Sequence, residues 1–350
     1  MNITFLTKYT SKGASSRYRY FLYLNRFMQR DVNLEIDSFF STHYIDSLYQ
    51  GKRSIYRVFI SYIKRFFVLL NSARFLVIEY EAFPYIPYFI ESFLLRKRQY
   101  VLNIDDNVWD NYKNTTLLKN KFDQLVTNAD GVIVANDFLF NKVSKLNTNI
   151  VKIPTALDTS LYSGSNQYKK FEKFSLVWIG TKITYKYIQS HAALFKKMAT
   201  LLDYQLVIVA SKDLKKYSID GVNMVFYDWS SKIESEILAK SHIGIMPLDN
   251  DDFSKGKSSF KIIQYMSAGL PVIASSIGEN NVVIQDGVNG FLVDDETSWI
   301  ASIRNLYNND DLYRNFSNMS LALSDNYSID QHVDQYYDFL KSSFMINEHK

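Results

Sequence analysis

Hydrophobic and polar positions follow one another in blocks that predict buried strands separated by amphipathic helices. Short apolar runs, each followed by a polar or glycine-containing loop, are typical of parallel strands buried on both faces. The clearest runs are Ile3–Leu6, Tyr100–Ile104, Gly131–Ala135, Ile150–Ile153, Leu176–Ile179, Leu206–Ala210, Val225–Trp229, Ile243–Pro247 and Val272–Ala274. Segments with helical spacing lie between many of these runs, and this alternation predicts a doubly wound α/β protein.

The length and the polar breaks predict two domains and a terminal helix. A chain of 350 residues is long enough for two full cores. We predict an N-terminal Rossmann-like domain over 1–160 and a C-terminal one over 161–328, with the boundary near the polar run SGSNQYKKFEK. Apolar positions at helical spacing predict a last helix over Asp330–Phe344, in a terminal segment spanning 329–350.

The stretch from Pro247 to Val293 contains the most informative helix. Ser258 or Ser259 is the predicted N-cap, and Ile262, Ile263 and Met266 are the predicted buried face. Gly269 stands where a C-cap needs a positive φ, and Pro271 ends the helix before the next strand.

Polar residues at the start of this helix suggest an anion site. Lys257 precedes the helix N-terminus, where free amides favour negative charge. Lys261 and Gln264 are three residues apart, so we expect them to share the face opposite the core. This pattern suggests a diphosphate near the lysines and hydroxyl groups near Gln264. An ordinary helix with a solvated polar face would show the same spacing.

A second phosphate-binding turn is predicted after strand Leu176–Ile179. Gly180 permits close backbone approach, and the amides of residues 181–184 with the Thr184 hydroxyl could cradle a phosphate. Thr181 belongs to the same turn. Two phosphate-favouring loops in one domain support a nucleotide-binding function for that domain.

The loop after the first strand carries donors that could meet a ligand. It reads KYTSKGASSRYRY and is followed by a predicted helix over Tyr20–Met28. Gly13, Ser15 and Ser16 could donate hydrogen bonds, while Arg17 and Arg19 could contact phosphate. Two surface arginines on a first helical turn are the plainer interpretation, because the loop has neither the GxGxxG nor the Walker pattern.

Two carboxylates, Asp105 and Asp106, follow the strand Tyr100–Ile104. Carboxylates at the tip of a parallel strand lie at the ligand-binding edge of an α/β sheet. They could contact a ligand, hold a divalent metal ion, or cap the next helix. The histidines of the chain have no metal-ligand spacing, and no nucleophile elbow or cysteine nucleophile occurs, which argues against zinc or triad hydrolysis.

Charge and aromatic content distinguish the two halves. Residues 1–158 carry 21 Lys and Arg against 14 Asp and Glu, and the remainder carries 19 against 22. Residues 52–75 and 83–98 combine basic with large apolar side chains, which suits a helix on an anionic membrane surface. Helices packed on the core with a basic outer face would have the same pattern. Nucleic acid is a weaker interpretation, because no recognition motif is present.

The sequence predicts a cytoplasmic protein, peripheral to the inner face of the plasma membrane. It contains no cysteine, no signal peptide is predicted, and no run of 18 apolar residues occurs.

The run FKIIQYMSAGLPVIAS, followed by Gly278-Glu279 and DGVNGFLV, resembles the donor-site signature of GT-B glycosyltransferases, specifically the GT4 family. The resemblance implies two Rossmann-like doubly wound domains facing across a cleft, with a C-terminal helix that crosses back to the first domain. Gln264 matches the family glutamate that holds the ribose of the nucleotide. The other family glutamate falls on Gly256, so that half of the motif is missing. The base-binding loop would lie near Trp229.

The resemblance implies transfer of a sugar from a nucleoside diphosphate sugar to a glycan or polyprenyl-linked saccharide in cell-surface polysaccharide synthesis, such as capsule or lipopolysaccharide. It favours a retaining reaction without a metal or another cofactor, in which Lys261 neutralises the leaving diphosphate and Asp105 or Asp106 orients the acceptor. In an inverting reaction, which the sequence leaves open, Asp105 or Asp106 would be the base. The expected donor contacts are Gly180, Thr181, Thr184, Trp229, Lys257, Ser258, Ser259, Lys261, Gln264 and Glu279. A sugar-nucleotide epimerase of the same fold, or a catalytically degenerate sugar-nucleotide-binding protein, are the alternatives.

Overall fold

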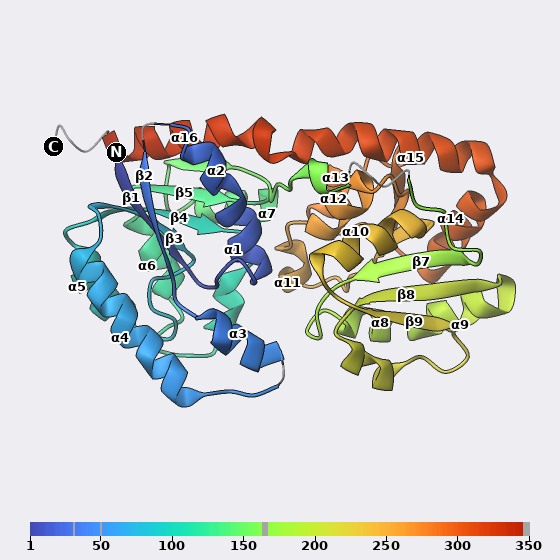
Figure 1. Cartoon of the computed structure of the whole chain (residues 1–350), viewed down its shortest axis with the longest axis horizontal. Coiled ribbons are helices and arrows are strands. Elements are labelled where there is room, and N and C mark those ends of the chain that lie inside the picture. The colour runs from blue at the N-terminus through green and yellow to red at the C-terminus, as the bar shows by residue number, and fades with distance from the viewer. Residues whose placement is uncertain (31, 50, 163–166, 346–350) are drawn as a thin grey trace. The chain divides into compact units, whose positions relative to one another are not determined.

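The computed structural model describes residues 1–30, 32–49, 51–162 and 167–345. The chain forms two compact units (Figure 1). Unit 1 contains residues 1–156, 256–258 and 329–350, and unit 2 contains residues 157–255 and 259–328. The first part of the predicted linker, residues 163–166, lies outside the described residues.

Unit 1 is built on a six-stranded parallel sheet with the order β2-β1-β3-β4-β5-β6. The strands predicted at Ile3, Tyr100, Gly131 and Ile150 are confirmed with small changes of bounds, whereas β2 and β3 were not predicted. The strands are β1 (Asn2–Thr7), β2 (Asn33–Ser38), β3 (Phe75–Glu79), β4 (Gln99–Ile104), β5 (Gly131–Val134) and β6 (Ile150–Lys152).

Helices connect these strands. The α-helices before the linker are α1 (Ala14–Arg19), α2 (Leu24–Phe27), α3 (Thr42–Tyr49), α4 (Ile55–Asn71), α5 (Tyr88–Leu95), α6 (Lys121–Thr127) and α7 (Asp137–Val143). The predicted helix over Tyr20–Met28 is wrong in its start: a helix already begins at Ala14, and a 3₁₀ turn over Phe21–Tyr23 separates it from α2. Ser15, Ser16, Arg17 and Arg19 are therefore helical residues instead of loop residues.

The helix predicted over Asp330–Phe344 is present as α16 (Ile329–Met345), and it is part of unit 1. Its buried Tyr336 packs edge-on against the rings of Tyr23 and Phe27, with ring centroids 5.1 and 5.3 Å away. The Tyr336 hydroxyl accepts a hydrogen bond of 2.9 Å from Asn103 Nδ2 at the end of β4. Such aromatic packing and a buried hydrogen bond fix the helix to the core of this unit.

Unit 2 is built on a second six-stranded parallel sheet, in the order β12-β11-β10-β7-β8-β9. Its strands are β7 (Phe174–Ile179), β8 (Tyr204–Ala210), β9 (Met224–Asp228), β10 (Ile243–Met246), β11 (Val272–Ser275) and β12 (Gly290–Val293). Its α-helices are α8 (Lys186–Ser190), α9 (Ala192–Leu201), α10 (Ser231–Lys240), α11 (Asp252–Lys255), α12 (Phe260–Ser267), α13 (Asn280–Val283), α14 (Glu296–Asn308) and α15 (Asp310–Ser324). The five strands predicted here are present.

In each sheet the strands are parallel, so the loops that follow them lie together at the carboxyl edge of that sheet. Ligands bind at this edge in parallel α/β folds. The central strands are almost fully buried, because crossover helices cover both faces. The predicted fold class is confirmed: the protein is α/β with two parallel sheets.

Candidate functional site

Helix α12 of unit 2 has the predicted buried face and C-terminus. Ile262, Ile263 and Met266 are inaccessible to solvent, and Gly269 has a φ of +71°, a conformation that glycine adopts without the steric cost of a Cβ. Ser259 is the N-cap residue, as predicted, but its side chain makes no capping hydrogen bond and its φ is +50°. Its hydroxyl instead donates to Asn280 Oδ1 at 2.6 Å, which ties the start of α12 to α13.

Gln264 is not on the solvated face of α12, and this part of the prediction is wrong. Its side chain is buried, and Nε2 donates to Glu234 Oε1 at 2.5 Å. Because the carboxylate only accepts, the amide nitrogen must face Glu234 and Oε1 must face away. Oε1 accepts from no donor among the described residues and is not sealed from solvent. Gln264 therefore presents an acceptor of fixed orientation, which suits a ribose hydroxyl.

Glu234, in the first turn of α10, is a residue that sequence reasoning missed. Its buried carboxylate also accepts from the Tyr162 hydroxyl at 2.8 Å and from Trp229 Nε1 at 2.5 Å. Trp229 and Gln264 were predicted separately as contacts of the base and the ribose, and Glu234 joins them. An acidic residue in the first turn of the helix after β9 was the available signal, but that position is common for a charge that complements the helix dipole.

Lys261 lies beside the turn that follows β7. Its ammonium group stands 4.8 Å from the ring centre of Trp178. A Cβ on Gly180 would come 2.2 Å from the same indole ring, so the glycine makes room for Trp178 whether or not a ligand is bound. Lys261, the turn at Gly180 and the indole ring of Trp178 therefore form one cluster within unit 2.

The turn over residues 180–184 offers fewer phosphate donors than predicted. Thr181 N donates to Thr184 Oγ1 at 3.1 Å, and Thr184 N donates to Thr181 O at 3.1 Å. The Thr184 hydroxyl donates in turn to Thr181 O at 3.2 Å. Among the described residues, the amides of Lys182 and Ile183 have no acceptor, so these two remain as candidate phosphate donors.

The segment before α12 explains the missing family glutamate. Residues 256–258, including Lys257 and Ser258, belong to unit 1, where Asn136 Nδ2 donates to Gly256 O at 2.8 Å. A Cβ on Gly256 would come 2.6 Å from Asn107 Cβ. A side chain at this position would require Asn107 or the backbone beside it to shift, which disfavours a glutamate here. Glu279, at the N-terminal end of α13, is buried.

In unit 1, the hydroxyls predicted to meet a ligand are bound to a protein carboxylate. Ser15 donates to Glu79 Oε1 at 2.7 Å and Ser16 to Glu79 Oε2 at 2.6 Å. The backbone amide of Lys8 also donates to Glu79, at 2.7 Å. Burial raises the pKa of Glu79, and these three hydrogen bonds oppose the shift. Glu79 thereby fixes α1 to the end of β3, a role that the sequence pattern did not reveal.

The predicted phosphate contact by Arg19 is not supported by its position. Its buried guanidinium donates twice to Asn103 Oδ1, at 2.9 and 2.5 Å, and once to Ile153 O at 2.6 Å. Arg17 is half-buried and donates to the Tyr18 hydroxyl at 3.1 Å. Gly13 is buried against Tyr9, since a Cβ there would lie 2.4 Å from Tyr9 Cβ. The contacts of Gly13 and Arg19 shape the edge of unit 1, and a phosphate contact by Arg17 stays a prediction.

Asp105 lies buried at the end of β4, next to the half-buried Asp106. The Tyr80 hydroxyl donates a hydrogen bond to its carboxylate. Burial, and then the charge of Asp106, raise the pKa of Asp105 to about 7. Tyr80 itself has a φ of +62°, an uncommon conformation for a residue with a side chain. A carboxyl group that titrates near neutrality is suited to accept or share a proton of an acceptor hydroxyl.

Within the described residues, no group of three or more histidine, cysteine, aspartate or glutamate side chains could hold a metal ion.

The chain was compared with known families and structures. Residues 173–309 match the family model described as glycosyl transferases group 1. No curated protein matches the sequence. Many solved structures match the chain, several of them over nearly its whole length, and the likeness shows the fold.

Three of these structures illustrate the match. Sucrose-phosphate synthase from Thermosynechococcus elongatus is 12% identical, covers 99% of this chain and 100% of its own, and has a TM-score of 0.68. The Anabaena protein HepE, solved with UDP and glucose, is 15% identical with coverages of 98% and 100% and a TM-score of 0.67. The lipopolysaccharide outer core galactosyltransferase WaaB is 12% identical, with coverages of 98% and 99% and a TM-score of 0.65.

The fold of this chain is the GT-B fold of these glycosyltransferases, as predicted. Together with the family match over 173–309, it supports an enzyme, namely a glycosyltransferase that uses a nucleotide sugar.

Proposed function

We propose that this protein is a GT4-type glycosyltransferase that moves a sugar from a nucleoside diphosphate sugar to a glycan or lipid-linked saccharide in cell-surface polysaccharide synthesis. The observation that carries the proposal is the cluster in unit 2, where the family match lies. There Gln264 presents an oriented acceptor through Glu234, and Lys261 stands beside the turn after β7.

The nucleotide half of the donor is assigned to this cluster. Gln264 Oε1 would accept from a ribose hydroxyl, and Trp229 lies within the same hydrogen-bonded group, where the base is expected. Lys261 and the amides of Lys182 and Ile183 would meet the diphosphate. Charge-assisted hydrogen bonds of this kind are stronger than neutral ones.

The reaction needs its leaving diphosphate to be stabilised. When the bond from the anomeric carbon to the phosphate oxygen breaks, negative charge develops on the diphosphate. Lys261 would neutralise that charge without a metal ion, since a preorganised positive group stabilises such a transition state. In a retaining reaction the departing phosphate can itself take the proton of the acceptor hydroxyl. Asp105 would then hold that hydroxyl in place.

The most direct test measures donor binding by calorimetry with UDP-sugars and other nucleotide sugars. Lys261→Ala should weaken binding by about 1.5–3 kcal/mol, the range for hydrogen bonds to charged groups. The matched control is Lys196→Ala, an exposed lysine on α9. Unchanged affinity in both Lys261→Ala and Lys257→Ala would refute the diphosphate assignment, whereas Lys196→Ala should bind the donor like the wild type. Release of nucleoside diphosphate only with a saccharide acceptor would support transfer, whereas an isomerised donor or binding without turnover would favour epimerisation or a degenerate binding protein.

An exposed apolar surface on unit 1 supports a lipid-linked acceptor. Helix α4 turns large apolar side chains to solvent, among them Ile55, Phe59 and Phe67, which are 87%, 61% and 57% exposed. The neighbouring α5 exposes Phe89 and Phe93. The α4–α5 apolar surface comprises Ile55, Tyr56, Phe59, Ile60, Ile63, Phe66, Phe67 and Leu70 together with Tyr85, Phe89, Ile90 and Phe93.

The two helices of this surface are neighbours at one edge of unit 1 (Figure 1). Tyr62 of α4 donates to Pro84 O before α5 at 2.5 Å, and Arg98 after α5 donates to Leu69 O at 2.5 Å. Apolar groups that face water in this number mark an interaction surface. Helix α4 also packs on the core through Leu69, Tyr62 and Val68, but most of its large apolar side chains face outward.

The occupant that we assign to the α4–α5 apolar surface is an anionic lipid bilayer. Exposed basic residues flank both helices, Lys52 and Arg53 before α4 and Arg96 and Lys97 after α5. Apolar burial and attraction to anionic headgroups then act together. Arg65 does not contribute, since it is buried against Asp37. No helix among the described residues is long and apolar enough to cross a membrane.

A further inference from the structure

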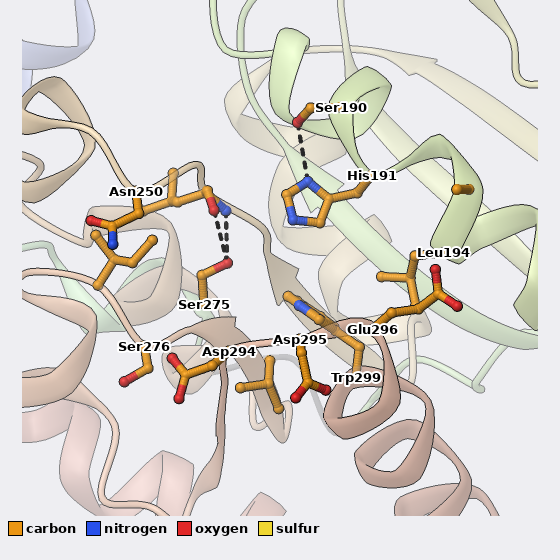
Figure 2. A pocket seen from close by; sticks show the side chains of 14 residues that line it. Ser190, His191, Leu194, Asn250, Ser275, Ser276, Asp294, Asp295, Glu296 and Trp299 are labelled. Carbon is orange, nitrogen blue, oxygen red and sulfur yellow. Dashed lines mark hydrogen bonds between the residues drawn. The ribbon is translucent and has the colours of Figure 1, made fainter.

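Unit 2 contains a second polar cavity that shares no residue with the proposed donor cluster. Its volume is about 370 Å³, near the lower end of the range of roughly 300–1,000 Å³ for small-molecule sites. It lies between the junction of α8 and α9, the loops after β10, β11 and β12, and the first turn of α14 (Figure 2). A ligand of the size of one or two sugar rings matches such a volume.

A buried hydrogen-bond donor faces this cavity. Trp299 of α14 lines the cavity and is only 2% exposed. Figure 2 shows the indole nitrogen turned toward the space that the labelled side chains enclose. Its N–H donates to no acceptor among the described residues, yet the atom is not sealed from solvent. A buried donor that is open to a cavity is suited to a ligand oxygen.

A hydrogen-bond acceptor faces the same cavity. His191 Nδ1 lies 2.9 Å from Tyr187 O and 3.1 Å from Ser190 Oγ. Because a carbonyl oxygen only accepts, Nδ1 of the neutral ring must carry the proton, and Nε2 is then an acceptor. Nε2 has no donor among the described residues and points into the cavity in Figure 2. The rings of His191 and Trp299 lie 6.3 Å apart between centroids, at 67° to one another.

One donor and one acceptor side by side complement a hydroxyl group. A hydroxyl can donate to His191 Nε2 and accept from Trp299 Nε1, whereas a carboxylate or phosphate oxygen can satisfy only the indole. Leu194 and Leu248 add apolar wall, which suits the C–H groups of a sugar ring.

The negative charge at the rim of the cavity disfavours anionic ligands. Asp294, Asp295 and Glu296 follow one another at the mouth of the cavity. Glu296 is paired with Lys197 at 2.8 Å, and Asp295 accepts from Ser298 N at 2.7 Å as the cap of α14. Asp294 is exposed and has no partner among the described residues, so its carboxylate is available to a ligand hydroxyl. Three carboxylates at the rim disfavour a nucleotide or a sugar phosphate.

We infer that this cavity is an accessory subsite for a neutral sugar ring, bound through hydroxyl groups to Trp299, His191 and Asp294. The shared chemistry is that of a free monosaccharide and of one ring in a glycan chain. The inference does not rest on the proposed transferase activity, because no residue of the donor cluster takes part.

The test is an NMR titration of the full chain, saturated with UDP, with methyl glycosides of glucose, galactose, mannose and N-acetylglucosamine. At least one glycoside should bind, with a Kd on the order of millimolar. Trp299→Phe keeps the ring but removes the N–H, and should weaken binding about 3- to 10-fold, the equivalent of one hydrogen bond. Asp294→Asn, at an exposed position, should also weaken it. The matched control Tyr307→Phe, at an exposed position of the same helix as Trp299 and outside the cavity lining, should leave it unchanged.

Several results would overturn the subsite. One is a complete lack of glycoside binding, and another is binding that UDP abolishes. A third is equal glycoside affinity in the wild type and in both variants, Trp299→Phe and Asp294→Asn. The fourth is tighter binding of glucose 1-phosphate than of the methyl glucoside. A trisaccharide of the bound sugar then identifies the source: tighter binding than the methyl glycoside supports a glycan chain, and equal binding supports a single ring. Failure of UDP itself to bind would count against the proposed function and not against this subsite, since the glycoside titration can still be read.

Discussion

The amide nitrogen of Gln264 lies 2.5 Å from a carboxylate oxygen of Glu234, and both side chains are buried. A glutamate at position 264 would place two carboxylates in contact, where one must take up a proton to avoid like-charge repulsion. The amide therefore complements the carboxylate on α10. The departure from the family pattern at this position has a physical reason within unit 2.

This relationship predicts the effect of Gln264→Glu. The variant should lose roughly 1–3 kcal/mol of stability at pH 8, because a buried hydrogen bond is replaced by repulsion. The carboxyl pair has a raised pKa in the folded state, so the loss should shrink as the pH falls to 5. Urea unfolding at both pH values measures it. The exchanged pair Glu234→Gln with Gln264→Glu restores one amide and one carboxylate, and should recover most of the stability. A double variant no better than the single one would contradict this account.

Sequence patterns predicted most of the fold because the strands are buried on both faces. A short apolar run such as Leu206–Ala210 therefore predicts a buried strand in a chain of this length. The β2 strand was missed since its sequence, NLEIDS, alternates polar and apolar residues at a sheet edge. The helix over Ala14–Arg19 was missed because Ser15 and Ser16 favour loops by propensity, and only their hydrogen bonds to the distant Glu79 explain their place.

The candidate site was predicted less completely, for a related reason. Spacing along α12 identified Lys261 and Gln264, but it could not show that Gln264 turns inward to Glu234, thirty residues away. Likewise, Arg65 was grouped with the basic residues of α4, although its contacts with Asp37, Thr7 and Ala82 join three separate segments. Local periodicity carries no information about such long-range polar partners.

The raised pKa of Asp105 predicts a pH dependence of stability. The folded-state pKa of about 7 lies above that of the unfolded chain, so between about pH 4 and 7 the folded protein binds more protons than the unfolded one. Stability contributed by this group should therefore fall as the pH rises through that window and level off above it. Asp106, Glu79, Tyr80 and Arg19 surround the carboxyl.

Asp105→Asn tests this expectation. The difference in unfolding free energy between Asp105→Asn and wild type should change in favour of the variant as the pH rises from 5 to 8. Tyr80→Phe removes a hydrogen bond that stabilises the carboxylate, and should move the transition to higher pH. A pH-independent difference between wild type and Asp105→Asn would show that the carboxyl is not perturbed in solution.

The α4–α5 apolar surface predicts reversible binding to anionic vesicles. Phe59→Ser with Phe67→Ser should release the protein, since each buried phenylalanine side chain contributes about 1.5–3 kcal/mol. Lys52→Gln with Arg53→Gln should weaken binding at low salt only, because exposed charges are screened at high salt. The matched control is Tyr307→Ser, an exposed aromatic residue of unit 2. Vesicle sedimentation measures the binding. If the wild type does not bind anionic vesicles even at low salt, the proposed membrane contact and the lipid-linked acceptor are both contradicted.

The two neighbouring cations of α4 predict losses of stability of different size from the same substitution. Arg65 is 1% exposed and pairs with the buried Asp37 at 2.6 Å, while Lys64 is 58% exposed and pairs with the same carboxylate at 2.5 Å. Arg65→Gln leaves the buried Asp37 without its main partner, and should cost about 3–5 kcal/mol. Lys64→Gln removes a solvated partner and should cost at most about 1 kcal/mol. Urea unfolding of the two variants makes the comparison. Equal losses would mean that Arg65 reaches solvent, and α4 would then present a basic face as well as an apolar one.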